Sequence, residues 1–265
     1  MATLDAVHRG LHAAALACAL LAFASPAAAS DWLPHPADAS WVYTWTDTAY
    51  NTAPTNEKVT VKEQKGASFS LAWTTQEMGN SDDAVAGAGF VAFQENPSGL
   101  FVVDWQATPP PPQFPIMCAQ VTQCGNSLSS SLFNLIWGNR TPLIVEPLLL
   151  DTSWSGVGGA RNDVASTSQV VDQEKVTVPA FPDGVTAVKV RSNVTQAGAI
   201  GDPYGSGIRD VWWVYGVGPV KIVFAHSGGT NAPVTTVELR STTLTPKALP
   251  TILNYFPMKK GATAT

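Results

Sequence analysis

Few residues of this chain have the types and spacing that catalysis requires. Beyond the first thirty residues the histidines are His35 and His226. Ser227, next to His226, and Ser206, within Tyr-Gly-Ser-Gly, are the nearest candidates for a serine activated by a histidine base. A nucleophile elbow needs Gly-x-Ser-x-Gly between a strand and a helix, and neither segment has this pattern. A hydrolase that uses His226 is therefore the weakest of the functions we consider.

Acidic side chains suggest metal binding or acid–base catalysis as a second kind of chemistry. His226 with Asp210 or Asp202 could bind a metal ion, but no spacing typical of ligand sets supports this. A glycosidase needs two carboxylates about 5–9 Å apart in a cleft. The pairs Asp82-Asp83 and Asp202 with Asp210 are more typical of solvated loops. The sequence therefore predicts no catalytic residue, no metal and no cofactor.

Aromatic residues give a stronger signal, since the chain has nine tryptophans. The stretch from Val211 to Phe224 predicts two strands joined by a four-residue type of turn at Gly216-Val217-Gly218-Pro219. Residues 211–215 are aromatic or β-branched and apolar on both faces, so we expect this strand to be covered on both sides. Burial of one such aromatic ring contributes up to about 4–6 kcal/mol. The main expectation for Trp212 and Trp213 is core packing, and the alternative is a ligand-binding aromatic wall of Trp212, Trp213 and Tyr215.

The first 29 residues predict a cleaved signal peptide. His8 and Arg9 form a short basic region, residues 11–23 are apolar, and Ala27-Ala28-Ala29 is a cleavage motif. We expect cleavage after Ala29 and a secreted or extracytoplasmic protein. The alternative, a lipid anchor on Cys18, lacks the usual leucine three residues ahead of the cysteine. The apolar run is too short to span a bilayer, and we expect no transmembrane segment in the mature chain.

The mature chain retains Cys118 and Cys124, which we expect to form a disulfide in an exported protein. So short a loop would give it about 2 kcal/mol of stabilisation. The net charge is −5 and only 13% of residues are charged, with no basic patch. Nucleic acid is therefore not an expected partner.

The remaining pattern predicts a mainly β fold in one domain over residues 30–244. Two β-rich blocks, 40–106 and 152–244, are separated by a Pro-rich connector (108–115) and one short helix over 127–137. We expect the blocks to share one curved antiparallel sheet, because neither has a helix of its own to cover it. Residues 245–265 should be an irregular tail. Expected strands are 41–46, 58–63, 67–75, 89–94, 100–105, 152–155, 185–194 and 235–241, with one strand or a hairpin over 162–178.

The second block also resembles a known family. Val-Pro-Ala-Phe at 178–181, Lys-Val at 189–190 and Trp213-Val-Tyr-Gly-Val-Gly-Pro-Val-Lys221 resemble the pattern VPAGTF…KV…WYAPGVGLVK of exported bacterial proteins of unassigned function. The resemblance covers about residues 148–224; Phe-Pro-Asp-Gly at 181–184 and Pro219 depart from the pattern. It implies a half-barrel of the lipoprotein-carrier (LolA-like) superfamily, with a sheltered apolar concave face and no catalytic residues.

These observations leave two main functions and a weaker third. The first is non-enzymatic binding of a lipid or another apolar molecule. The second is a structural or interaction protein of the cell envelope, whose aromatic residues all belong to the core. The third is the hydrolase. The sequence specifies neither the ligand nor the oligomeric state.

Overall fold

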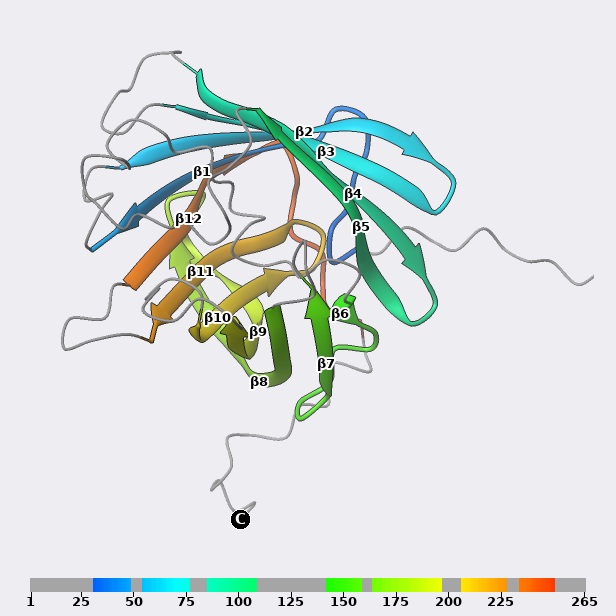
Figure 1. Cartoon of the computed structure of the whole chain (residues 1–265), viewed down its shortest axis with the longest axis vertical. Helices are drawn as coiled ribbons and strands as arrows, with labels where there is room; N and C mark the ends of the chain where they lie inside the picture. The colour runs from blue at the N-terminus through cyan, green and yellow to red at the C-terminus, as the bar shows by residue number, and fades with distance from the viewer. Residues whose placement is uncertain are drawn as a thin grey trace, which may run out of the picture.

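The computed structural model describes residues 31–48, 54–76, 85–108, 142–158, 164–196, 206–227 and 234–250, all of which form strands, turns or extended segments. The predicted signal peptide, Pro-rich connector, helix over 127–137 and Cys118–Cys124 disulfide lie outside the described residues. No helix in the described ranges is long and apolar enough to cross a membrane. The described residues form twelve strands, which Figure 1 labels. The first six are β1 (Ser40–Asp47), β2 (Thr55–Lys65), β3 (Ser68–Gln76), β4 (Val85–Asn96), β5 (Gly99–Thr108) and β6 (Pro142–Val145). The others are β7 (Ser153–Gly158), β8 (Val164–Val178), β9 (Phe181–Gln196), β10 (Gly207–Val214), β11 (Gly218–His226) and β12 (Val234–Thr242).

All twelve strands belong to one antiparallel sheet. Its order is β6-β5-β4-β3-β2-β1-β12-β11-β10-β9-β8-β7, so the first block contributes β1–β5, the second contributes β7–β12, and the edge strand β6 comes from the segment between the blocks. The blocks join where the first strand pairs with the last, with Trp41 opposite Thr242 and Asp47 opposite Thr235. The prediction of a mainly β, antiparallel fold is thus confirmed. The segment over 162–178, open between a strand and a hairpin, is the single long strand β8.

The sheet curls further than the predicted half-barrel. Its two end strands, β6 and β7, lie close together because only residues 146–152 connect them. Trp154 Nε1 of β7 donates a hydrogen bond to the Pro142 carbonyl of β6 at 3.1 Å. This side-chain bond takes the place of a backbone ladder between the end strands. The result is a barrel-like sheet that is nearly closed (Figure 1).

The two ends of this sheet differ in how the strands are connected. At one end the four hairpin turns are short, 66–67, 97–98, 179–180 and 215–217, and the connection 146–152 between β6 and β7 lies at this end too. The extended segment 31–39 packs at this end, where Gly216 N donates to the Asp31 carbonyl at 2.7 Å and Trp32 packs edge-on against Tyr215. At the other end the connections are longer in sequence: 48–54, 77–84, 109–141, 159–163, 197–206 and 227–233. We call the end with the short turns the sealed end and the opposite end the long-connection end.

The core lies on the inner face of the sheet. Trp41 and Trp213 are the largest of its fully buried side chains, each 1% exposed. Two of its large polar side chains are hydrogen-bonded: Trp41 Nε1 donates to the Val217 carbonyl at 2.7 Å, and Tyr43 Oη donates to the Pro219 carbonyl at 2.9 Å. Burial, followed by the negative charge of Glu57, raises the pKa of Tyr43 well above its ordinary value. Tyr43 is therefore a neutral donor in the core.

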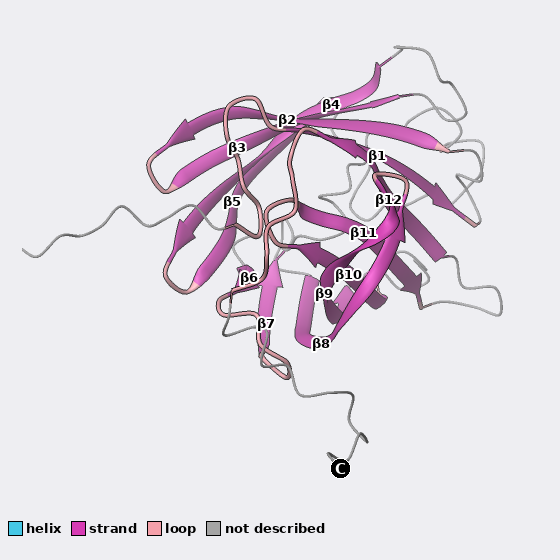
Figure 2. Cartoon of the chain, turned by 180° about the vertical axis from the view of Figure 1, so that it is seen from behind, coloured by secondary structure: helices cyan, strands magenta, loops and turns pink. Residues whose placement is uncertain are grey.

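Residues 211–214 of β10 are buried on both faces, as predicted for residues 211–215, whereas the outer face of β11 is partly exposed. Val211 lies opposite Ile222 on the inner face, and a bulge between Trp212 and Trp213 shifts the register on the way to the turn. Trp212 and Val214 point to the outer face, yet they are only 8% and 1% exposed. They are covered by the end of the β8–β9 hairpin. This end reaches β12 (Figure 2), where Ala180 N donates a hydrogen bond to the Leu239 carbonyl.

Candidate functional site

The three predicted aromatic residues do not form one wall. Trp213 is 1% exposed on the inner face, while Trp212 lies on the outer face beneath the β8–β9 hairpin. Tyr215 is half-buried in the turn at the sealed end, with its ring 5.2 Å from that of Trp32. Burial, together with the hydrogen bond to Asp31, raises the pKa of Tyr215 to about 12. The three rings therefore contribute to three different contacts of the hairpin.

The residues considered for hydrolysis or metal binding are also separated. His226 points inward, and its Nε2 lies 2.7 Å from Thr235 Oγ1. Asp210 points to the outer face, because it pairs across the ladder with Val223, an odd number of positions from His226. Asp202 and Asp82-Asp83 lie outside the described residues. Within the described ranges no three His, Cys, Asp or Glu side chains gather into a metal-binding group.

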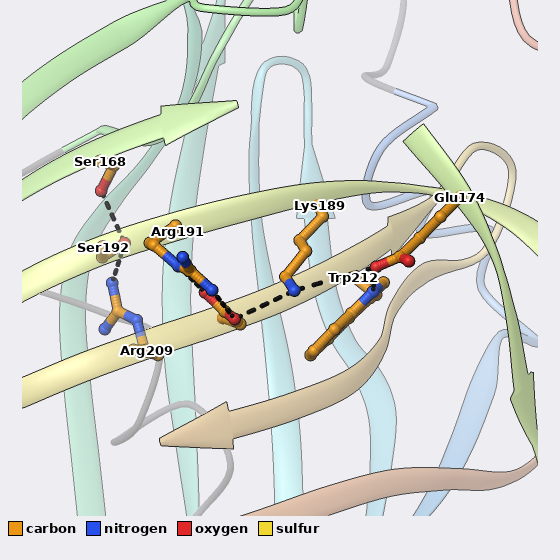
Figure 3. Close-up of polar contacts among 8 residues, drawn as sticks. Ser168, Glu174, Lys189, Arg191, Ser192, Arg209 and Trp212 are labelled. Carbon is orange, nitrogen blue, oxygen red and sulfur yellow. Dashed lines mark hydrogen bonds and ion pairs between the residues drawn. The ribbon is translucent and has the colours of Figure 1, made fainter. Parts of the chain in front are cut away.

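An ion-pair network covers the outer face of β8, β9 and β10 (Figure 3). Arg191 makes two parallel hydrogen bonds to Asp210, Nε to Oδ1 and Nη2 to Oδ2, both at 2.7 Å. Lys189 Nζ lies 3.1 Å from Asp210 Oδ2 and 3.9 Å from Glu174 Oε1. It also lies 4.5 Å from the centre of the Trp212 ring, whose Nε1 donates to Glu174 Oε1 at 2.8 Å. Each of these charges therefore has an opposite partner.

The network shifts the pKa of Asp210. Burial acts to raise this pKa, but the hydrogen bonds from Arg191 and Lys189 and their positive charges outweigh it, so that the pKa is lowered. The hydrogen bond to Asp210 raises the pKa of Arg191. This is the behaviour of a structural ion pair that stabilises both of its charged forms.

The inner face of the same strands carries a second polar group. Ser168, Ser192 and Arg209 are adjacent across β8, β9 and β10, and they are 3%, 1% and 8% exposed. Ser168 Oγ and Ser192 Oγ are 2.8 Å apart, and Arg209 Nη2 donates to Ser192 Oγ at 3.1 Å. Figure 3 shows this row on one side of the strands and the ion-pair network on the other. Burial lowers the pKa of Arg209 to about 10.

Apolar side chains accompany Arg209 on the inner face. Phe224 lies directly opposite it on β11, and Phe224 and Val194 form a buried apolar pair outside the main core cluster. The His226 ring packs on Phe224 with the ring centres 4.1 Å apart. Other buried polar side chains near the long-connection ends of their strands are Thr55, Glu57, Thr75 and Thr235. Together these residues make the inner face amphipathic at this end.

The sealed end has a different interior. Its aromatic stack places the His35 ring 3.6 Å from that of Phe69, and the Phe69 ring 4.9 Å from that of Phe93. His35 Nδ1 donates to the Leu33 carbonyl at 2.9 Å and lies 4.0 Å from Glu95 Oε1. The aromatic side chains therefore fill the inner face here.

The alternation of residues in one strand could have placed Arg209 in the interior. Arg209, Val211 and Trp213 share one face of a strand by simple alternation. Since that face is buried, the pattern places an arginine in the interior. The serines that hold it come from β8 and β9, and only the register of those strands reveals them.

Comparisons with known proteins identify no family for this chain. No family model and no curated protein matches it. Among solved structures, a candidate lipoprotein of Parabacteroides distasonis ATCC 8503 has a TM-score of 0.46 at 11% identity, covering 81% of this chain and 99% of that one. A candidate exported protein of Bacteroides fragilis NCTC 9343 with a YmcC-like fold has a TM-score of 0.46 at 9% identity, over 79% and 97% of the two chains. The hypothetical lipoprotein YmcC of Escherichia coli (K12) has a TM-score of 0.29 at 8% identity, over 78% and 88%.

Proposed function

We propose that this chain is an exported, non-enzymatic binding protein that holds a lipid or another apolar molecule at the long-connection end of its barrel-like sheet. The observation that carries the proposal is the difference between the two ends of the inner face. One end is filled by its own aromatic side chains, and the other combines an apolar pair with buried polar groups. Ligand sites commonly have this composition and lie in the mouths of barrels.

The direction of entry follows from the sealed end. Trp32 and Leu33, in the segment that packs there, are each 2% exposed. The Gly216–Asp31 and Lys247–Tyr215 backbone hydrogen bonds fasten both chain segments around the β10–β11 turn. A ligand that reached the inner face from this side would have to displace core residues. We therefore place its entry at the opposite end.

Export and the absence of catalysis are parts of the same proposal. Residues 1–29 have the pattern of a secretory signal, and the second block resembles exported bacterial proteins of LolA-like type. The described histidines, His35 and His226, pack on aromatic rings rather than beside a serine nucleophile. Binding, rather than bond breaking, is what this geometry supports.

Two measurements test the binding function. Protein purified from its native host is extracted with solvent, and the extract is analysed by mass spectrometry for a stoichiometric lipid. The delipidated protein is then titrated with dodecanol while tryptophan emission is followed. We expect a saturable change that Phe224→Ala weakens and that Val157→Ala, a change at an exposed outer position, leaves intact. If no lipid copurifies and dodecanol leaves the emission unmoved, the alternative of a purely structural envelope protein replaces this proposal.

A further inference from the structure

We propose that the outer face of β12, β1 and β2 docks on a phospholipid bilayer that carries negative charge. The cations that would contact the bilayer are Lys58, Lys62 and Lys65 of β2 and Arg240 of β12, and we call this group the basic face. The inference goes beyond the proposed function, because it concerns how the protein meets a membrane and not what it holds inside.

The fold gathers cations that the sequence keeps apart. Lys58 and Arg240 come from opposite ends of the chain, but β2 and β12 are the two neighbours of β1 in the sheet (Figure 1). Val42 of β1 pairs with Lys58 on one side and with Ser241, the residue after Arg240, on the other. All four cations of the basic face are exposed. The sheet therefore has a basic face although the sequence contains no basic run.

Two β-bulges lie within the basic face. The ladder between β1 and β12 shifts its register so that Arg240 is the extra residue. The ladder between β2 and β3 shifts in the same way at Lys62. A bulge leaves an extra residue outside the regular ladder and is a common way to re-aim a side chain. Both extra residues here are cations that point away from the core.

The basic face differs from the other cations of the outer surface in its lack of carboxylate partners. Four cations elsewhere have a carboxylate oxygen 2.7–3.9 Å away: Lys189, Arg191, Lys221 and Lys247. Within the described ranges no ion pair includes a cation of the basic face. Arg240 Nη1 instead lies 3.5 Å from the uncharged Asn56 Oδ1.

Two acidic side chains lie near the basic face without cancelling its charge. Glu238 of β12 is paired with Lys221, whose Nζ lies 2.8 Å from Glu238 Oε1. Glu63 is exposed next to Lys62 and offsets one positive charge. The face therefore keeps an excess of positive charge, and the partner that complements it is anionic.

The spread of the cations favours a surface over a single small anion. Three of them follow one strand from Lys58 to Lys65, which at about 3.3 Å per residue is a stripe of about 20 Å. Lys62 Nζ lies 3.8 Å from the centre of the Phe90 ring, which is half-buried on the outer face of β4. Long basic side chains beside an aromatic ring suit the headgroup region, where ammonium groups meet phosphates and rings meet the apolar boundary. A stripe of this kind matches many headgroups at once.

The net charge of the chain makes the docking orientation specific. It is −5, so a negatively charged bilayer repels the molecule as a whole and attracts only a face with excess positive charge. Binding should therefore depend on the cations of the basic face and not on the total number of lysines. It should also weaken with salt, because exposed charges are screened.

The experiment is cosedimentation of the full mature protein with vesicles at about 0.1 M salt. Vesicles of phosphatidylcholine and phosphatidylglycerol in equal parts should bind the protein, and vesicles of phosphatidylcholine alone should not. Lys58→Gln and Arg240→Gln should each weaken binding about fivefold, the effect of one cation near an anionic membrane. Lys175→Gln is the matched control, because it removes an exposed lysine of β8, outside the basic face, and should leave binding unchanged.

Each other outcome contradicts the inference. Equal binding to both kinds of vesicle, or binding to neither, would show that the basic face does not dock on anionic lipid. An equal loss in Lys175→Gln would mean that total charge, and not this face, matters. If polyglutamate binds to the basic face and vesicles do not, the partner is an acidic polypeptide. If inorganic phosphate displaces the protein more strongly than chloride at the same ionic strength, a single-anion site replaces the lipid surface. Dodecanol binding should be unchanged in Lys58→Gln, so the proposed function stands or fails separately.

Discussion

The sealed end and the long-connection end are built from the same twelve strands but use their inner faces differently. At the sealed end, Trp41, Trp213 and the His35–Phe69–Phe93 stack fill the space between strands with rings. At the other end the inner face carries Arg209, Ser168 and Ser192 beside a two-residue apolar pair. Close-packed apolar contacts provide most of the stability of a fold.

This difference suggests that the two ends of the sheet have different roles. Apolar packing at the sealed end stabilises the fold, and the long-connection end carries polar groups that a ligand would use. The outer and inner faces of the sheet also differ at the level of Arg209. On the outer face Arg191 and Lys189 form ion pairs with Asp210, and on the inner face Arg209 donates a hydrogen bond to Ser192.

Removal of a core ring at each end gives the largest expected effects. We expect Trp213→Ala to lower the free energy of unfolding by about 3–5 kcal/mol, because a fully buried ring leaves a cavity that the packed surroundings cannot fill. Phe224→Ala should cost about 1–2 kcal/mol less, since its apolar cluster has only one other member. Urea denaturation followed by far-ultraviolet circular dichroism measures both. Equal losses would show that the two ends are packed alike.

Two glycines test the backbone at the two ends. Gly99 (φ 139°) and Gly207 (φ 150°) have conformations that favour glycine, and a Cβ would lie 2.0 Å from the Ile144 carbonyl oxygen or 2.2 Å from the Ala225 carbonyl oxygen. Each change to alanine should cost about 2–4 kcal/mol through strain and overpacking.

The comparison between these two variants is more informative than either alone. Gly99 lies at the sealed end, so Gly99→Ala should perturb the core without changing dodecanol binding. Gly207→Ala displaces the start of β10 at the long-connection end and should weaken dodecanol binding as well. Thermal denaturation and ligand titration on the same samples provide the check. A loss of dodecanol binding in Gly99→Ala would argue against separate roles for the two ends.

Asp210→Asn tests the outer-face network and has a defined pH dependence. We expect a loss of about 1–2 kcal/mol at neutral pH, because two charge-assisted hydrogen bonds from Arg191 become weaker. The folded-state pKa of Asp210 lies below its ordinary value of 3.8, so its stabilisation is complete above that value and is lost as the pH falls through the folded-state pKa.

Denaturation of the native chain and of Asp210→Asn between neutral pH and about pH 3 measures this difference. The gap in stability should stay constant down to about pH 5 and narrow below about pH 4. A gap that instead widened with acid would mean that the carboxylate is destabilised by the fold, which contradicts the network. Dodecanol binding, measured at neutral pH, should be the same in both proteins.

Local pattern was sufficient to predict most strands. Alternation over residues 41–46, 67–75 and 185–194 predicted β1, β3 and β9, because one face of each strand is buried and one is not. The turn glycines placed the β10–β11 hairpin, although its loop is residues 215–217, and Gly218 and Pro219 already belong to β11. Strand ends were less well predicted: β2 begins at Thr55 and not at Lys58, since ladder pairing with β1 extends it.

Relations between distant strands could not be predicted from pattern. The pairing of β1 with β12, the contact between β6 and β7, and the fold of the β8–β9 hairpin over Trp212 depend on the register of the whole sheet. For this reason the aromatic wall of Trp212, Trp213 and Tyr215 was a plausible grouping in the sequence but is divided among three contacts in the structure. Arg209 shows the converse, since its strand position indicated burial but not its serine partners.

The smallest expected effect comes from an ion pair at the surface of the sealed end. Lys247 Nζ lies 2.7 Å from Asp31 Oδ1, and the lysine side chain is 56% exposed. Exposed pairs contribute about 0–1 kcal/mol, and salt screens them. Lys247→Ala should therefore lower the free energy of unfolding by at most about 0.5 kcal/mol, and the difference should vanish in 1 M salt. The backbone bond from Lys247 N to the Tyr215 carbonyl is retained in this variant, so a loss of several kcal/mol would show that the ion pair, rather than apolar packing and backbone hydrogen bonds, closes the sealed end.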